Sequence, residues 1–145
     1  MKIKNPKNII TNNREATIRA GEQLAKSLGP GCLVALTGEL GSGKTTLVKG
    51  IAKGLGVRNY RYVNSPSFVI IKEYRGKIPL YHFDVFRIDS PSDIDALSFE
   101  EYFYRDGICV VEWADRIRKL LPKKYIEVKI KILEGNRRKI YVKSE

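Results

Sequence analysis

The chain has 145 residues and 43% of them are hydrophobic, which suits one compact domain, residues 1–145, and argues against a disordered chain. It holds no run of about 18 apolar residues that could cross a membrane, and its first residues lack the apolar segment of a secretory signal, so a cytoplasmic location with no membrane partner is expected. The net charge is +11, which favours contact with acidic partners over contact with basic ones.

The first half of the chain predicts a helix, a strand, a loop and a second helix. A helix is expected after the capping residues 11–13, because small and apolar residues recur every four positions, and it should end at Gly29. Residues 32–37 form a continuous apolar run, which predicts a strand buried on both faces. A glycine-rich loop follows, and the next helix has one apolar side and is closed by Gly54 and Gly56.

The second half predicts two strands, a helix, a further strand and a terminal hairpin, after a loop over residues 57–66. Ser90 and Pro91 suit the start of a helix that runs to about residue 104. Because helices alternate with strands early and an antiparallel ribbon closes the chain, we expect a three-layer α/β fold with a mixed, mainly parallel sheet and a C-terminal antiparallel hairpin. The expected strands are 67–74, 80–86, 107–112, 125–133 and 139–142, with a short helix over 114–121.

The glycine-rich loop, residues 38–45, matches the Walker A pattern Gly-x-x-x-x-Gly-Lys-Thr and lies between the expected strand and helix. It therefore predicts a P-loop NTPase-like fold that binds a nucleoside triphosphate with Mg²⁺. Glycines let backbone N–H groups approach phosphate oxygens at a helix N-terminus. Lys44 would bring a positive charge to the β- and γ-phosphates, and the Thr45 hydroxyl would bind Mg²⁺. The residues expected to contact the nucleotide are Gly38, Gly41, Ser42, Gly43, Lys44, Thr45 and Thr46.

A second acid is expected near the metal, at the end of a strand beside the loop. Asp84 and Glu112 are the candidates, and Glu112 follows four apolar residues in the manner of a Walker B strand. A surface acid just outside the sheet is the alternative for Glu112. The guanine-binding pattern Asn-Lys-x-Asp is missing from the sequence, which favours ATP over GTP. A small-molecule P-loop phosphotransferase stays open as an alternative enzyme.

Four blocks of sequence together resemble the TsaE family, small bacterial ATPases of tRNA threonylcarbamoyladenosine biosynthesis. The resemblance spans about residues 14–143, and the last three blocks are more specific than the Walker pattern. It implies an ATPase with weak activity of its own that acts on a complex of TsaB and TsaD, which modifies adenosine 37 of tRNA, so that contact with tRNA is indirect. The blocks are residues 36–46, Asn64-Ser65-Pro66-Ser67-Phe68, Tyr81-His82-Phe83-Asp84-Val85-Phe86-Arg87 and Val110-Val111-Glu112-Trp113-Ala114-Asp115.

Carried over residue by residue, the resemblance gives Lys44 and Asp84 catalytic roles. Lys44 would neutralise phosphate charge, and Asp84 would orient the attacking water or support the metal shell. Thr45 and Glu112 would hold Mg²⁺. The segment Ser65–Ser67 resembles a switch that senses the γ-phosphate, with an ordinary proline turn as the alternative.

Trp113 and one charged region leave alternatives open, whereas His82 and the cysteines are interpreted as structural. His82, the one histidine, is interpreted as a structural strand residue, and Trp113 either contacts nucleotide or partner or anchors the core. Both cysteines are interpreted as small core residues. Residues 116–143 carry eleven bases and two acids. This region could bind nucleic acid or form a solvated surface, because no RNA-binding signature accompanies the charge.

Overall fold

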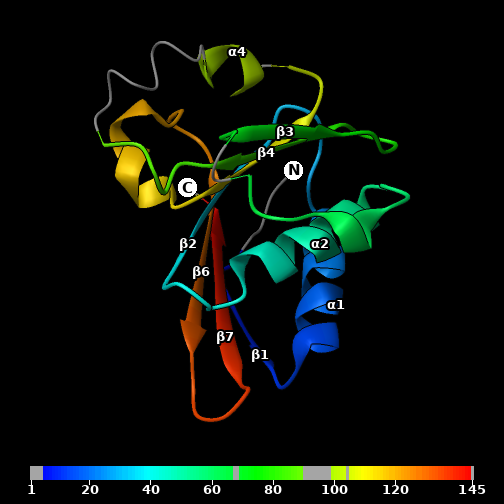
Figure 1. Ribbon diagram of the computed structural model, residues 1–145, viewed down its shortest axis with the longest axis vertical. Helices are drawn as coiled ribbons and strands as arrows, with labels where there is room; N and C mark the ends of the chain where they lie inside the picture. The colour runs from blue at the N-terminus through cyan, green and yellow to red at the C-terminus, as the bar shows by residue number, and fades with distance from the viewer. Residues whose placement is uncertain (1–4, 67–68, 90–98, 104, 145) are drawn as a thin grey trace.

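A seven-stranded sheet forms the middle of the molecule (Figure 1). The computed structural model describes residues 5–66, 69–89, 99–103 and 105–144. The strands in chain order are β1 (Lys7–Thr11), β2 (Leu33–Gly38), β3 (Ile71–Tyr74), β4 (Leu80–Asp84), β5 (Ile108–Glu112), β6 (Ile126–Ile132) and β7 (Arg138–Ser144).

The order of strands across the sheet is β1-β7-β6-β2-β5-β4-β3. The four central strands β6, β2, β5 and β4 run parallel to one another. The outer strands β3, β7 and β1 each run antiparallel to their neighbours. The mixed sheet and the C-terminal antiparallel hairpin, β6 with β7, are therefore confirmed.

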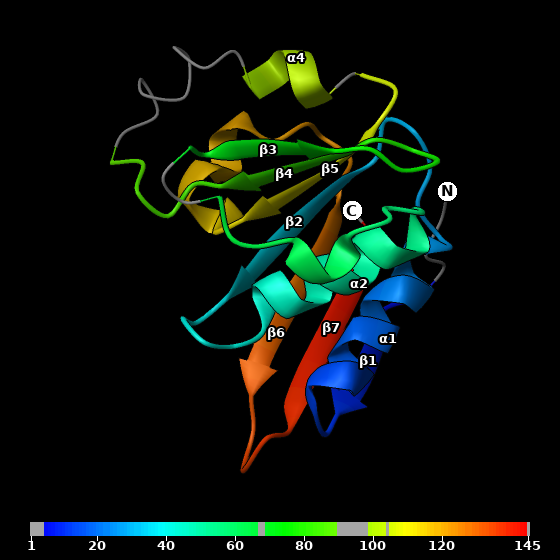
Figure 2. The same cartoon turned by 45° about the vertical axis from the view of Figure 1, so that its right-hand side comes forward.

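Helices cover both faces of this sheet, so the three-layer α/β arrangement is confirmed. Figures 1 and 2 show the two long helices side by side along one face. A short helix and a 3-10 segment lie on the other face. The helices are α1 (Arg14–Ala25), α2 (Lys44–Gly54) and α4 (Phe99–Phe103), and the 3-10 segments are η1 (Tyr60–Tyr62) and η2 (Ala114–Leu120).

Each face of the sheet contributes to its own hydrophobic core. The larger core packs α1 and α2 against β2, β4, β5, β6 and β7. The smaller one packs α4 and η2 against β2, β4 and β5, with Ile71 of β3 at its margin and with Phe83 and Phe99 in edge contact at 4.9 Å between ring centroids. On that side of the sheet, this second core stops at β2 and does not extend over β6, β7 and β1.

Several element boundaries differ from the sequence-based predictions. The prediction that the first helix runs to Gly29 is wrong: α1 ends at Ala25, because Ser27 and Leu28 donate to carbonyls three residues back and tighten the chain into a turn. β4 ends at Asp84 and not at residue 86, because the Asp84 carboxylate accepts a hydrogen bond from the Phe86 N–H and turns the chain.

Other predicted elements are found in part. β1, which no pattern predicted, starts the sheet at one edge. β3 covers residues 71–74 of the expected strand over 67–74, and residues 67–68 lie outside the described residues. Of the expected helix over residues 90–104, the described part shows α4, and residues 90–98 and 104 lie outside it.

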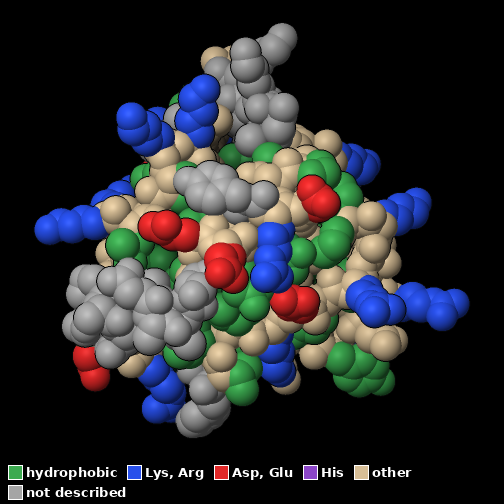
Figure 3. All heavy atoms as spheres, turned by 90° about the horizontal axis from the view of Figure 1, so that it is seen from above, with side chains coloured by type: hydrophobic (Ala, Val, Ile, Leu, Met, Phe, Trp, Pro, Cys, Tyr) green, Lys and Arg blue, Asp and Glu red, His purple; other side chains and the backbone are tan. Residues whose placement is uncertain are grey.

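The surface at the α4 and β3 end of the molecule carries charges of both signs. Figure 3 shows acidic and basic side chains next to one another on this face. Arg105 forms ion pairs with Glu73 at 3.6 Å and with Glu101 at 3.9 Å. Exposed pairs of this kind each contribute at most about 1 kcal/mol, so they balance the charge of this end more than they stabilise the fold.

Candidate nucleotide-binding site

The loop over residues 38–43 connects β2 to α2 at the carboxyl end of the parallel strands (Figure 2). Gly41 and Gly43 have φ values of 78° and 105°, in the left-handed region that favours glycine. A Cβ atom at either position would meet no other atom within 4 Å, so the loop is open there. A Cβ atom at Gly38 would instead lie 2.6 Å from Ser42 Oγ. The loop is therefore packed at its base and open at its tip.

The N-terminus of α2 directly follows this loop. Its capping residue, Gly43, has no side chain to accept hydrogen bonds from the first turn, and the first turn holds no acidic residue. The dipole of α2 therefore favours an anion at this end. The Ser42 hydroxyl is fully buried, and its oxygen has no hydrogen-bond partner among the described residues. The open glycine positions, the uncapped helix and this hydroxyl fit a bound phosphate group.

Lys44 folds back over the loop that precedes it. Its Nζ donates hydrogen bonds to the carbonyl oxygens of Gly38 at 2.6 Å and Glu39 at 2.8 Å. The same atom lies 4.1 Å from the centroid of the Trp113 ring, a cation–π contact. Burial lowers the pKa of Lys44, although the nearby carboxylates of Glu112 and others oppose that shift. The lysine is therefore held at the open loop by contacts that a phosphate could replace.

Glu112 ends β5, the strand that lies beside β2. The Thr45 hydroxyl is hydrogen-bonded to both of its carboxylate oxygens, at 3.1 and 3.2 Å. His82 Nε2 lies 2.5 Å from Glu112 Oε2, while His82 Nδ1 is buried with no partner among the described residues. Glu112 is only 2% exposed, so these contacts offset the cost of burying its charge. The alternative of a surface acid is thereby excluded for this residue.

Asp84 ends β4 and lies beside Glu112 in the parallel register of β4 and β5. Its carboxylate accepts hydrogen bonds from the Ser65 hydroxyl and, at 2.9 Å, from the Phe86 N–H. Asp84 is 2% exposed. The structure therefore joins Ser65, in the expected switch segment, to the strand that carries this acid, whereas Ser67 lies outside the described residues.

The segment that leads to Ser65 is also tied to α2. Lys49 lies on α2 and is 8% exposed. Its Nζ donates hydrogen bonds to the carbonyl oxygens of Arg61, at 2.8 Å, and Val63. The helix that begins at the phosphate loop and the segment before Ser65 are thus linked by one buried side chain.

Two residues with unusual backbone angles adjoin the acids. Among the described residues, Ile70 and Trp113 are the non-glycine positions with positive φ, at 71° and 62°. Trp113 directly follows Glu112, and the Ile70 carbonyl accepts a hydrogen bond from the Asp84 N–H at 2.9 Å. Bulky residues rarely adopt such angles, and strained backbone of this kind gathers at functional sites.

The open tip of the phosphate loop and the two acids surround a pocket of about 370 Å³, a size typical of small-ligand sites. Among the described residues no group of three or more His, Cys, Asp or Glu forms a dedicated metal site. Mg²⁺ in phosphate sites needs only one or two carboxylates, with phosphate oxygens and waters completing its shell, so the donors present fit Mg-ATP. The pocket is lined by Leu40, Gly41, Gly43, Lys44, Thr45, Ser65, Asp84, Phe86, Arg87, Glu112 and Trp113.

The structure thus brings most of the predicted site residues together. Gly38 and Ser42 lie at the packed base of the loop, and Thr46 follows in the first turn of α2 without lining the pocket. Sequence reasoning missed Arg138, whose Nε donates to the Ser42 carbonyl at 3.1 Å and whose Nη2 donates to the Gly41 carbonyl at 3.4 Å. No motif identifies this arginine, because β7 meets the loop only in the folded sheet.

Comparison with known proteins identifies the family. The model of the family described as "Threonylcarbamoyl adenosine biosynthesis protein TsaE" matches residues 11–140. The chain belongs to the TsaE family. The Bacillus subtilis (strain 168) protein named "tRNA threonylcarbamoyladenosine biosynthesis protein TsaE" is 44% identical over 131 residues, which cover 90% of this chain and 80% of that protein. A Treponema pallidum (strain Nichols) protein of the same name is 35% identical, over 92% of this chain and 97% of its own.

A solved structure supports the same assignment. The crystal structure of Bacillus subtilis YdiB superposes on this TsaE-family chain with a TM-score of 0.80 and 35% identity, over 99% of this chain and 88% of that one. The α/β fold is therefore shared with a solved structure. Within the part of the chain that the structure describes, no helix has the length and apolar character needed to cross a membrane.

Proposed function

We propose that this TsaE-family protein binds and hydrolyses ATP with Mg²⁺ and acts on a TsaB–TsaD complex in the threonylcarbamoyl modification of tRNA adenosine 37. The observation that carries the nucleotide part is the contact between Thr45 and Glu112. A hydroxyl at the start of α2 and a carboxylate at the end of the adjacent strand form the pair of groups with which P-loop proteins hold Mg²⁺.

The phosphate loop and the two acids have distinct roles in this proposal. Backbone N–H groups of residues 41–46 would bind the phosphates, and Lys44 would exchange its two loop carbonyls for phosphate oxygens. Thr45 and Glu112 would hold the metal, with His82 fixing the orientation of the glutamate. Bound ATP would supply the γ-phosphoryl group for transfer to water, and Asp84 would orient that water or a water of the metal shell.

The link to a partner complex is supported by family membership and by the Ser65–Asp84 hydrogen bond. A γ-phosphate or the metal near Asp84 would change the hydrogen bonds that its carboxylate accepts, and the position of Ser65 would change with them. The segment after η1 would then report the state of the nucleotide to a docked partner. P-loop proteins with such segments often hydrolyse slowly alone, so weak activity of the isolated chain is expected.

Calorimetric titration with ATP, with and without Mg²⁺, tests the nucleotide site. Lys44→Ala and Thr45→Ala should each weaken Mg-ATP binding, by about tenfold or more, whereas Thr45→Ser keeps the hydroxyl and should bind nearly normally. Glu112→Ala should reduce the dependence of binding on Mg²⁺. If Glu112→Ala leaves that dependence unchanged while Asp84→Ala abolishes it, the assignment of the metal to Glu112 is wrong.

Association with TsaB and TsaD is tested by a pull-down over a range of ATP concentrations, using Lys44→Ala as the control with weakened nucleotide binding. We expect the association of the unaltered protein to change at a lower ATP concentration than that of Lys44→Ala. Failure to associate with or without ATP would contradict the proposed partner. Transfer of labelled phosphate from ATP to a metabolite, in place of release to water, would favour a phosphotransferase.

A further inference from the structure

One face of the sheet is left uncovered by the second helix layer. The core beneath α4 and η2 includes residues of β2, β4 and β5, and among the described residues none of β6, β7 or β1 belongs to it. Arg118 and Leu121 line a small cavity with Glu127 of β6, so the open part of β6 begins after Glu127. Alternation along these strands puts the exposed side chains on this side and the buried ones against α1 and α2. We call the part of this surface around Tyr141 the open sheet face, and it consists of Asn8, Ile10, Lys129, Lys131, Lys139 and Tyr141. Glu127 and Lys143, which are opposite one another in the register, lie beyond it on the same side.

The open sheet face holds an unbalanced pair of positive charges. Lys131 on β6 and Lys139 on β7 are directly opposite in the antiparallel register, and both are exposed. Like charges in this position repel and destabilise a sheet. Within the described residues, no ion pair joins either lysine to an acid, whereas Lys129 pairs with Glu127 at 3.0 Å. An anion bound between Lys131 and Lys139 would remove this repulsion.

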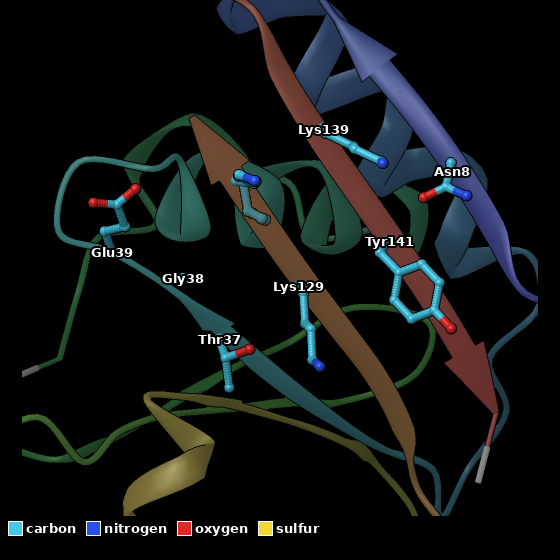
Figure 4. Close-up of a pocket in the computed structure, with 9 residues that line it drawn as sticks. Asn8, Thr37, Gly38, Glu39, Lys129, Lys139 and Tyr141 are labelled. Carbon is cyan, nitrogen blue, oxygen red and sulfur yellow. The ribbon is translucent and has the colours of Figure 1, made fainter. Parts of the chain in front are cut away.

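A hollow of about 400 Å³ lies over the same strands, and it is lined mainly by apolar surface beside these charges. Figure 4 shows the ring of Tyr141 lying on β7 between the side chains of Lys129 and Asn8. Tyr141 is half-buried, and Asn8 supplies an amide that can donate and accept hydrogen bonds. The face thus offers an aromatic ring, a polar amide and several ammonium groups within one hollow.

We propose that the open sheet face is a binding site for single-stranded RNA, with a base on Tyr141 and backbone phosphates at Lys131 and Lys139. Aromatic rings on an antiparallel sheet, surrounded by lysines, bind unpaired bases by stacking and their phosphates by charge. The acidic side chains of a peptide would use the lysines but would leave the Tyr141 ring and the apolar hollow unused, whereas a nucleotide uses both. This site adjoins the nucleotide pocket, because Gly38 and Glu39 of the phosphate loop form one of its edges. Binding there does not require ATP hydrolysis.

The test is fluorescence anisotropy with a labelled single-stranded RNA of about 12 nucleotides, within the site sizes of known single-strand binders. Lys131→Gln with Lys139→Gln should weaken binding about tenfold. Each phosphate contact contributes about 0.7 to the slope of log K against log salt, so that slope should fall by about 1.4. The matched control, Lys123→Gln with Lys124→Gln, removes two exposed lysines from the turn before β6 and should bind as the unaltered protein does.

Tyr141 separates stacking from charge. Tyr141→Leu should weaken binding about tenfold at all salt concentrations without changing the slope, and Tyr141→Phe should bind almost normally. Circular dichroism checks that each variant is folded, and Mg-ATP titration of the same proteins reports the nucleotide site independently. The inference is overturned if RNA does not bind, if both lysine pairs have equal effects, or if an acidic peptide competes as well as unlabelled RNA does.

Discussion

Gly50 allows α2 to lie directly against α1, and its replacement by alanine tests whether this contact holds the helix that carries the phosphate loop. A Cβ atom at Gly50 would lie 2.8 Å from the Ile18 carbonyl carbon and 3.0 Å from the Gly21 Cα atom. Ordinary contacts of a Cβ atom lie at 3.4–4 Å. Because the opposing atoms belong to the backbone of α1, no side-chain rotation can relieve the overlap and the two helices must separate.

The sign of the effect follows from two opposing magnitudes. Alanine in a helix interior gains about 1 kcal/mol over glycine. Overpacking costs about 1–3 kcal/mol and sometimes more, and here it also separates two helices that share the larger core. We expect Gly50→Ala to lower the free energy of unfolding by about 1–2 kcal/mol, which corresponds to a melting temperature about 3–7 °C lower in a protein of this size.

Thermal unfolding followed by circular dichroism measures this effect, with Gly29→Ala as the matched control. Gly29 has no positive φ, and a Cβ atom there would meet nothing within 4 Å, so the control should be unchanged or slightly more stable. The reasoning is refuted if Gly50→Ala melts at or above the temperature of Gly29→Ala. Mg-ATP affinity should fall with Gly50→Ala and not with the control, because α2 carries Lys44 and Thr45.

Three further predictions concern buried titratable groups. Because burial lowers the pKa of Lys44 below 10.5, the affinity for Mg-ATP should decline as pH rises through that lowered pKa; affinity that stays constant up to pH 10.5 would contradict this. Burial raises the pKa of Cys109 from 9.0 to about 12, so at mildly alkaline pH a thiol reagent should modify the half-buried Cys32 first and reach Cys109 only after denaturation. The pKa of Cys109 is higher in the folded state than in the unfolded chain, so the free energy of unfolding should also fall as pH rises from 9.0 towards 12. Equal reaction rates of the two cysteines in the folded protein would refute the burial of Cys109. Lys49→Met leaves two backbone carbonyls without their donor and should lower the free energy of unfolding in urea by about 1–3 kcal/mol. Lys53→Met on the same helix removes an exposed ion pair and should lower it by less than about 1 kcal/mol. Equal losses would show that the buried contacts of Lys49 do not stabilise the fold.

The central part of the fold was predictable because its patterns are local. The apolar run before the phosphate loop is typical of a buried strand, and Thr45 and Glu112 follow from patterns of a few residues each. β1 was not predictable in this way. Its five residues include Lys7 and Asn8, and three of the five are exposed. Among the described strands it pairs with β7 alone, more than a hundred residues later.

The same contrast between local patterns and distant packing applies to the contacts of the site. The sequence indicated that Lys44 and Trp113 matter, but no pattern indicates their cation–π contact or the left-handed backbone at Trp113. Likewise, the hydrogen bond between Ser65 and Asp84 joins two segments that only the strand order brings together. Residue types and spacing predict which groups do the chemistry, while the packing of distant segments decides which groups hold them in place.

The strand order also has a consequence for how the protein is made. β2, which ends at the phosphate loop, is flanked by β5 and β6, so its hydrogen-bonding partners are residues 109–112 on one side and 126–130 on the other. During translation the loop leaves the ribosome well before these partners are synthesised. Sheets built from such distant pairings form slowly, and their unpaired strands are exposed to aggregation in the meantime. A nascent chain arrested before residue 126 should therefore expose an edge of β2 to chaperones.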